Sequence, residues 1–555
     1  MDASKYKKMY FPVPLDRRTW PGNEITKAPI WCSVDLRDGN QALETPLSPE
    51  EKLMFFNMLT EIGVKEIEVA FPAASDSDYT FVRTLIEQKL IPDDTKISVL
   101  AQMRPHILEK TFEAIDGAKN VIVHLYNSTS ELQRRLVFGL SKEEIKEIAT
   151  KGAEQALALS KKHTGKVWFE YSPESFMGTE AEYSAEICNA VLDVLKPAEV
   201  GKVIINLPET LEMATPNVYA DHIEYMCNHL KYRENVLVSL HTHNDRGCAV
   251  AATEMGLLAG ADRVEGTLFG NGERTGNADL MVIAMNMYMQ GIDPGLNFSS
   301  MESLADMYET ITHMDIHPRH PYAGELVFTA FSGSHQDAIK KCMDYSASHP
   351  QNKWENPYIT INPADIGRHF DPIRINSQSG KSGIAFVMQR KFGVFLPKSV
   401  SQELSFILTD VSDREHKELT PQLIYDTFID EFVDIVKPVR LIDYDVLSKK
   451  GQTEIVVTMD CEGEDKKYIG TGNGPLDAMA DVIRTGMGLN IEISGYHEHA
   501  LQHGSSSEAL AYVGIKDMEN RTTWGAGSDT NISTASIKAL ISAANRYILK
   551  FEKKD

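Results

Sequence analysis

The stretch that decides the fold is residues 202–245, KVIINLPETLEMATPNVYADHIEYMCNHLKYRENVLVSLHTHND. It opens with a β-branched run at 202–207 and continues through a polar, proline-containing break into a longer helix-like segment. It ends in a second β-branched run at 236–243. This alternation predicts two parallel strands joined by a helix.

The same unit repeats between residues 30 and 270. Helical segments are predicted at 48–62, with Pro49 in the first turn, and at 141–163, which opens with the capping pattern SKEE. Eight strands alternating with helices over about 250 residues predict an α/β fold, the (β/α)8 TIM barrel. A doubly wound open sheet is the weaker alternative, because it usually has fewer strands and no GxGxxG follows the first one. The other predicted strands are IWCSVDL (30–36), VKEIEVAF (64–71), KISVLAQ (96–102), NVIVHLY (120–126), KVWFEYS (166–172) and RVEGTLFG (263–270).

The pattern changes after about residue 324, where the predicted barrel domain, residues 1–324, ends. Residues 325–436 are expected to form a small α/β linker region of short elements that contributes to the active site, with a helical stretch at about 397–436. Lys437 and Pro438 mark the next boundary. Residues 437–555 are strand-rich, and we expect an α+β regulatory domain of two tandem strand-strand-helix units.

Composition restricts the class of protein. Lys and Arg number 56 against 79 Asp and Glu, a formal net charge of −23 that argues against nonspecific nucleic-acid binding. The six cysteines are scattered without a CxxC pair, which is typical of a reducing compartment. No apolar run approaches the roughly 18 residues of a membrane span, and the N-terminus lacks a signal-type apolar core. We therefore expect a cytoplasmic protein that binds neither nucleic acid nor membrane.

Ionisable side chains gather at the C-terminal ends of the predicted strands, where a TIM barrel carries its active site. His241 and His243 are two residues apart on one strand, so both imidazoles face the same side. Two neutral imidazoles and a carboxylate suit a catalytic divalent metal. Asp38 is the expected carboxylate, and Asn277 can add an oxygen. The alternative is a pair of strand-end histidines that only form hydrogen bonds.

Two further charged residues lie at these ends. Arg37, next to the metal carboxylate, is placed to hold a substrate oxygen and to stabilise alkoxide charge. Its ordinary alternative is a surface ion pair with Asp38, which is worth little. Glu68 lies in the otherwise apolar run EVAF and would be costly to bury alone, so we expect it to pair with Arg37 or another cation.

Three motifs, DLRDGNQAL (35–43), HTHND (241–245) and GNGERTGNADL (270–280), resemble in this order those of a metal-dependent acyltransferase and lyase superfamily. Nearly the whole chain resembles the longer form of the 2-isopropylmalate synthases. The resemblance implies a Claisen-type condensation of acetyl-CoA with 2-oxoisovalerate and water to give 2-isopropylmalate and CoA, the first committed step of leucine biosynthesis. It also implies a homodimer, leucine as effector, a divalent metal (Mg²⁺ first, Mn²⁺ or Zn²⁺ as alternatives) and a monovalent cation such as K⁺ as activator.

The resemblance also assigns roles to residues of this chain. His335, in the linker, matches a histidine proposed for proton chemistry, and with Tyr358 it would reach the barrel mouth of the partner subunit. Glu174 would lie beside the approach of the acyl donor. Gly472, Gly474 and Ala478 lie in the segment that matches a leucine-binding regulatory domain. The implied catalytic residues are Arg37, Glu174, His335 and Tyr358; the substrate-binding residues are His124, Ser172, Thr210 and Glu68; the metal ligands are Asp38, His241, His243 and Asn277.

Other functions stay open at this stage. Citramalate synthase, or another 2-oxo acid acyltransferase on the same barrel, would differ only in the pocket volume for the side chain. Homocitrate synthases typically carry a glutamate where Asp38 stands, which argues against them. A biotin-dependent carboxyltransferase would need a biotin-bearing lysine motif near the C-terminus, and none is found. A leucine-sensing binding protein is the non-enzyme alternative, and the C-terminal domain alone has a purely structural alternative, dimerisation.

Overall fold

The chain forms two compact units. The structure is a computed structural model that describes residues 1–330, 332–350, 352–368, 381–415, 419–449, 451–501 and 507–552. The first unit comprises residues 1–327 and 363–368, and the second comprises the described parts of 328–362 and 369–555.

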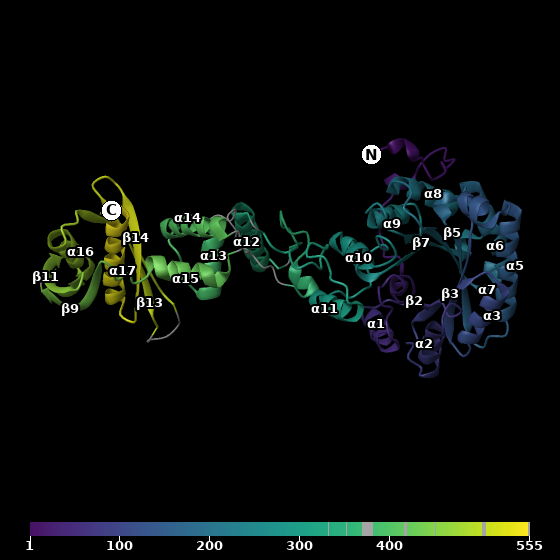
Figure 1. Ribbon diagram of the computed structural model, residues 1–555, viewed down its shortest axis with the longest axis horizontal. Coiled ribbons are helices and arrows are strands. Elements are labelled where there is room, and N and C mark those ends of the chain that lie inside the picture. The colour runs from purple at the N-terminus through teal and green to yellow at the C-terminus, as the bar shows by residue number, and fades with distance from the viewer. Residues whose placement is uncertain are drawn as a thin grey trace. The chain divides into compact units, whose positions relative to one another are not determined.

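Eight parallel strands close into a barrel in the first unit (Figure 1). Each strand pairs with the next one along the chain, and the last pairs with the first through Ile30 opposite Arg263. The predicted TIM barrel is therefore confirmed. The strands are β1 (Ile30–Ser33), β2 (Glu66–Ala70), β3 (Lys96–Gln102), β4 (Asn120–Ser128), β5 (Lys166–Glu174), β6 (Val203–Glu209), β7 (Val236–Thr242) and β8 (Arg263–Gly266).

Helices lie around the barrel (Figure 1), and the two whose starts the sequence predicts begin at Ser48 and Ser141 as expected. Ser48 with Glu51, and Ser141 with Glu144, form capping boxes that satisfy the first backbone N–H groups of two of them. The helices of this unit are α1 (Pro49–Glu61), α2 (Asp76–Glu87), α3 (Pro105–Ala114), α4 (Glu131–Gln133), α5 (Lys142–Ser160), α6 (Ala181–Leu195), α7 (Pro197–Val200), α8 (Pro216–His229), α9 (Ala249–Leu258), α10 (Leu280–Met289) and α11 (Met301–Thr312).

The second unit contains two antiparallel sheets, each followed by a helix that packs into a shared apolar core. The expected α+β domain of two tandem units is confirmed, although each sheet has three strands rather than two. The first strand of the first sheet is not predicted because it contains a bulge. Leu441 pairs with Met459 and Asp443 with Thr458, so the inward-facing positions of this strand do not alternate strictly. The elements are β9 (Val439–Lys449), β10 (Gln452–Cys461), β11 (Glu464–Gly472), α16 (Pro475–Gly486), β12 (Ile491–Ala500), β13 (Ala509–Asp517), β14 (Thr522–Asp529) and α17 (Ile532–Tyr547).

The linker differs from its prediction as well. Where a small α/β region was expected, the described residues of 325–436 form helices and contain no strand of a sheet. The apolar run at Ile359 and Ile361 stays a loop, because Asn356 accepts hydrogen bonds from the backbone N–H groups of Tyr358 and Ile359. The helical stretch predicted at 397–436 is divided into two helices. The four helices are α12 (Gly333–Ser348), α13 (Lys381–Phe392), α14 (Lys398–Glu415) and α15 (Pro421–Phe432).

Within the described ranges, every helix is too short or too polar to cross a bilayer.

Candidate active site

A cavity of about 280 Å³ lies at the C-terminal ends of the barrel strands. Part of its wall is apolar and comes from Phe71, Leu100 and Pro208. Most of the predicted site residues of the barrel also line the cavity: Arg37, Asp38, His124, Ser172, Glu174, Thr210, His241 and His243. Strands far apart in the sequence therefore bring their polar ends to one chamber.

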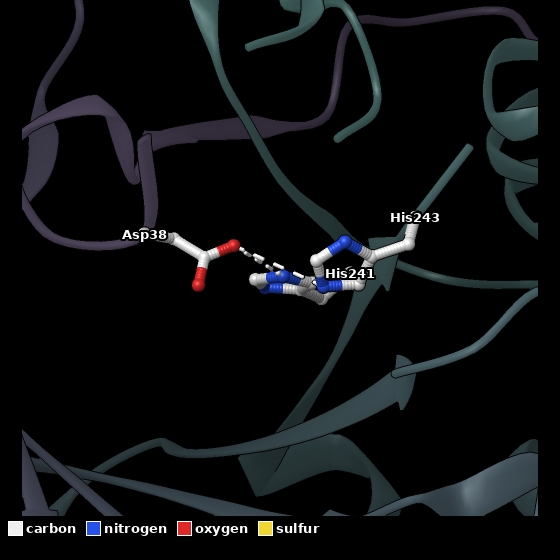
Figure 2. A group of neighbouring side chains, drawn as sticks. All are labelled: Asp38, His241 and His243. Atoms are coloured by element: carbon white, nitrogen blue, oxygen red, sulfur yellow. Dashed lines mark ion pairs between the residues drawn. The ribbon is translucent and has the colours of Figure 1, made fainter. Parts of the chain in front are cut away.

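Three buried side chains at this cavity form a cluster that can hold a metal ion. Asp38 faces the two imidazoles across the chamber (Figure 2). Its Oδ2 lies 3.5 Å from Nε2 of His241 and 3.9 Å from Nε2 of His243. Ligand atoms bound to one ion at about 2.0–2.2 Å lie at comparable distances from one another. The donor set, two imidazoles and a carboxylate, thus fits a divalent metal with open positions.

Asn277 completes this cluster from the strand-eight loop. It forms an isolated bridge with His243, and its Nδ2 donates to Oδ2 of Asp38 at 2.8 Å. Its Oδ1 is buried, and none of the described residues gives it a hydrogen bond. An amide whose oxygen has no partner next to a candidate metal site is suited to a further oxygen ligand.

The charges of the cluster are set by its neighbours. Burial alone would raise the pKa of Asp38, but the Arg37 guanidinium and His241 outweigh it and hold that pKa well below its usual range. Burial disfavours the charged form of His241, yet hydrogen bonds to Asp38 and Glu265 raise its pKa to about 9. Burial, together with the charge of His241, lowers the pKa of His243 to about 4.

A chain of hydrogen bonds runs from Arg37 along the cavity wall. Arg37 contacts Asp38 through Nη1, and its Nε donates to Glu68 at 2.5 Å. The second oxygen of Glu68 meets Nδ1 of His124 at 2.6 Å, and Nε2 of His124 meets the Ser172 hydroxyl at 2.7 Å. The expectation that buried Glu68 pairs with a cation is confirmed. Glu68 itself is not among the residues that line the cavity, and its contacts are to Arg37 and His124.

Beneath the metal cluster lies an ionic network that the sequence reasoning missed. Arg263, fully buried, donates to Glu66 and Glu265 at 2.7 Å each and to Glu170 at 3.2 Å. Glu265 in turn contacts Nδ1 of His241 at 2.8 Å. A signal existed in the sequence: Arg263 and Glu265 are two apart in RVEG, so both face one side of their strand, as the two histidines do.

Arg274, which the sequence did not single out, holds the strand-eight loop against the loops that follow β6 and β7. Arg274 donates through Nε to Asp245 at 2.7 Å and through Nη2 to the Thr210 carbonyl at 2.7 Å. Gln41 donates to Glu273 of the same loop at 3.0 Å. Because Asn277 follows directly, these contacts fix the loop that presents it to the metal cluster.

The remaining predicted residues of the barrel also have defined partners. Glu174 accepts a short hydrogen bond from the Ser128 hydroxyl. The Thr210 hydroxyl oxygen accepts the Ser175 backbone N–H at 3.0 Å, which leaves its own proton for another acceptor.

The other predicted residues belong to the second unit. His335 and Tyr358 are exposed and stack on each other with ring centroids 4.0 Å apart. Gly472 ends β11, and Gly474 caps α16. A Cβ at Gly472 would lie 2.5 Å from the backbone nitrogen of Ala478, so this glycine permits the close approach of strand and helix.

Three family models match successive parts of the chain. They are HMGL-like over residues 28–308, the alpha-isopropylmalate synthase post-catalytic domain over 325–389, and the LeuA allosteric (dimerisation) domain over 418–548. A 2-isopropylmalate synthase of Helicobacter hepaticus is 51% identical over 99% of this chain and 100% of its own length. The chain belongs to the 2-isopropylmalate synthase family.

Further members of the 2-isopropylmalate synthase family show the same full-length similarity. The protein from Acetoanaerobium sticklandii is 51% identical over 100% of this chain and 98% of its own length, and the one from Rhizobium johnstonii is 49% identical over 99% and 98%. Membership makes the chain an acyltransferase, as the resemblance predicted. The HMGL-like family is metal-dependent, in agreement with the cluster at Asp38.

Metal binding at this cluster should depend on pH through His241. Its pKa of about 9 means that the imidazole is charged at neutral pH, and a metal must displace that proton. His243 stays neutral above pH 5 and adds no dependence. We expect the Mn²⁺ dissociation constant of the metal-free protein, measured by electron paramagnetic resonance, to rise about tenfold for each pH unit lowered between 8 and 6. An Asp38→Asn variant should bind weakly at every pH, whereas a flat profile in the wild type would contradict the assignment.

Proposed function

We propose that this chain condenses acetyl-CoA with 2-oxoisovalerate and water to form 2-isopropylmalate and CoA. The observation that carries the proposal is the single cavity in which Arg37 and Asp38 of one strand end face the two histidines of another. The full-length similarity to 2-isopropylmalate synthases supports it, and disfavours the carboxyltransferase and the binding protein.

Arg37 is the residue that we assign to the developing alkoxide. Its Nε and Nη1 are held by Glu68 and Asp38, and within the described residues its Nη2 makes no hydrogen bond. A fixed guanidinium with one free N–H edge costs no reorganisation when negative charge forms on the ketone oxygen. When bound at Asp38, His241 and His243, a divalent metal, which we propose to be Mg²⁺, supplies a Lewis acid for the same ketone.

The 2-oxo acid fits the remaining wall. Thr210 has a hydroxyl proton available for a carboxylate, and Ser172 is oriented by His124. Leu100 and Pro208 provide the apolar surface that a branched side chain needs. Pocket volume decides between an isopropyl and a methyl group, so citramalate chemistry is the competing outcome in the assay below.

Acetyl-CoA must lose a methyl proton to a base before its carbon attacks the ketone. The new carbon–carbon bond turns the ketone oxygen into an alkoxide, which takes up a proton. Water then cleaves the thioester to a carboxylate and the CoA thiol. We assign the proton transfer to His335, oriented by its stacking on Tyr358, with Glu174 beside the acyl donor.

We further propose that His335 and Tyr358 serve the barrel of a partner subunit, so that the homodimer is the catalytic unit. The pair lies in the linker region, which we place at 325–436. The match of residues 418–548 to an allosteric and dimerisation domain supports both dimer formation and leucine as the effector of the 437–555 domain. A monovalent cation such as K⁺ is proposed as an activator.

The assay that tests the function is thiol release from acetyl-CoA with three 2-oxo acids, with and without Mg²⁺. We expect a kcat/KM for 2-oxoisovalerate about 10- to 200-fold above those for pyruvate and 2-oxobutyrate, the range for pocket differences of a few carbons. Arg37→Ala should lower kcat by about 100- to 1,000-fold. Lys151→Ala, which removes an exposed cation that pairs with Glu147 within α5, is the matched control. A preference for pyruvate would replace the proposal with citramalate synthesis.

Sharing of sites between subunits is testable by mixing two inactive variants. Asp38→Asn removes the barrel cluster and His335→Ala removes the proposed base. A mixed dimer holds one intact site out of two if each site forms from both chains, and random pairing makes about half of the dimers mixed. The refolded mixture should therefore regain up to about a quarter of wild-type activity. The two variants should stay inactive separately. An inactive mixture after unfolding and refolding together, with mixed dimers confirmed by mass, would place His335 on its own barrel, whereas an active His335→Ala variant would place it outside the reaction.

Leucine should inhibit the full-length protein. We expect leucine to lower thiol release at subsaturating 2-oxoisovalerate by about 5- to 150-fold, the usual range of allosteric coupling, and alanine to have little effect. Because coupling between two binding equilibria is reciprocal, 2-oxoisovalerate should weaken leucine binding in calorimetry by the factor by which leucine weakens 2-oxoisovalerate binding. Leucine that binds without changing the rate would leave this domain a structural one.

A further inference from the structure

We infer that Glu265 is a positioning residue that keeps a proton on Nδ1 of His241 and so directs Nε2 of that ring at the metal cluster. The inference rests on the metal site of the proposed function and adds a residue to it. Metal-bound histidines generally donate their other ring N–H to a carboxylate, which sets the tautomer.

The contacts of Glu265 use both of its oxygens. Oε1 accepts from Arg263 at 2.7 Å, while Oε2 receives Nδ1 of His241 at 2.8 Å and Nδ2 of Asn206 at 2.9 Å. The side chain is fully buried. Every partner of Glu265 is therefore a donor, and Nδ1 of His241 must carry its proton to fit this arrangement.

The opposite ring nitrogen faces the metal cluster. Nε2 of His241 lies 3.5 Å from Oδ2 of Asp38. With the proton held on Nδ1, loss of the second proton leaves a lone pair on Nε2, the form that binds metal. Asn206 also donates to the Ser172 hydroxyl at 3.0 Å, so the same carboxylate is tied to the 2-oxo acid pocket.

A glutamine at position 265 cannot replace the carboxylate. If its amide nitrogen faces His241 and Asn206, that nitrogen opposes two other hydrogen-bond donors. His241 can remove its share of the conflict only by moving its proton from Nδ1 to Nε2. If the nitrogen faces Arg263, it opposes a guanidinium. Either orientation disturbs the His241 ring or the contact with Arg263. An aspartate at position 265 would keep the charge, but its side chain is one methylene shorter than that of glutamate.

The experiment compares Mn²⁺ binding by wild type, Glu265→Gln and Glu66→Gln, followed by electron paramagnetic resonance. Glu66 is the matched control because it also accepts from Arg263 at 2.7 Å and is buried, and its other partner is Lys96 at 2.7 Å. We expect Glu265→Gln to bind Mn²⁺ about 10- to 100-fold more weakly and Glu66→Gln to bind as wild type. Equal affinities in wild type and Glu265→Gln, or equal losses in both variants, would overturn the inference.

A second measurement does not depend on how a variant folds. Protein labelled with ¹⁵N at histidine and saturated with Mg²⁺ should show His241 with a protonated Nδ1 and an unprotonated Nε2 in nitrogen–proton correlation spectra. A proton on Nε2 would refute the role of Glu265. Wild-type protein that binds neither Mn²⁺ nor Mg²⁺ would instead refute the metal site of the proposed function.

Discussion

The polar interior of the barrel depends on the ion pairs of the Arg263 guanidinium. Because this side chain has no exposed surface, loss of any of its carboxylate partners would leave a buried charge less well paired and would strongly destabilise the fold. Those partners come from β2, β5 and β8, and Ser239 of β7 accepts a further bond at 2.8 Å. One side chain therefore ties four strands together, and a one-residue slip of any of them would leave a charge unpaired.

A continuous series of contacts connects Arg263 to the candidate metal ligands. Arg263 holds Glu265, Glu265 holds His241, and His241 faces Asp38. Asp38 in turn meets Arg37, which is held by Glu68. Burial raises the pKa of Glu170 well above its usual range, although the neighbouring Arg263 opposes this. The polar interior thus serves the site more than the stability of the fold.

How far the sequence predicts this structure depends on whether a pattern is local. β-branched runs and capping boxes at Ser48 and Ser141 are local, so the barrel and its helices follow from sequence. β9 is not predicted because a bulge at Ile442 interrupts the alternation of its apolar and polar residues. Within the site, residues at strand ends such as Arg37 can be predicted from sequence. Glu265 lies inside a strand, and its role depends on contacts with His241 of β7 and Arg263 of its own strand, which only the folded barrel shows.

The net charge of −23 says little about this site, because the charge that a substrate meets is local. The cavity wall carries two guanidinium groups, Arg37 and Arg274, against three carboxylates. With the two histidines of the metal cluster neutral, as metal binding requires, these five charged groups sum to one negative charge and disfavour a 2-oxo acid. A divalent ion reverses that sign. We therefore expect anionic substrate to bind more tightly when the ion is present. A network that positions the metal ligands would then act on substrate affinity through the metal as well.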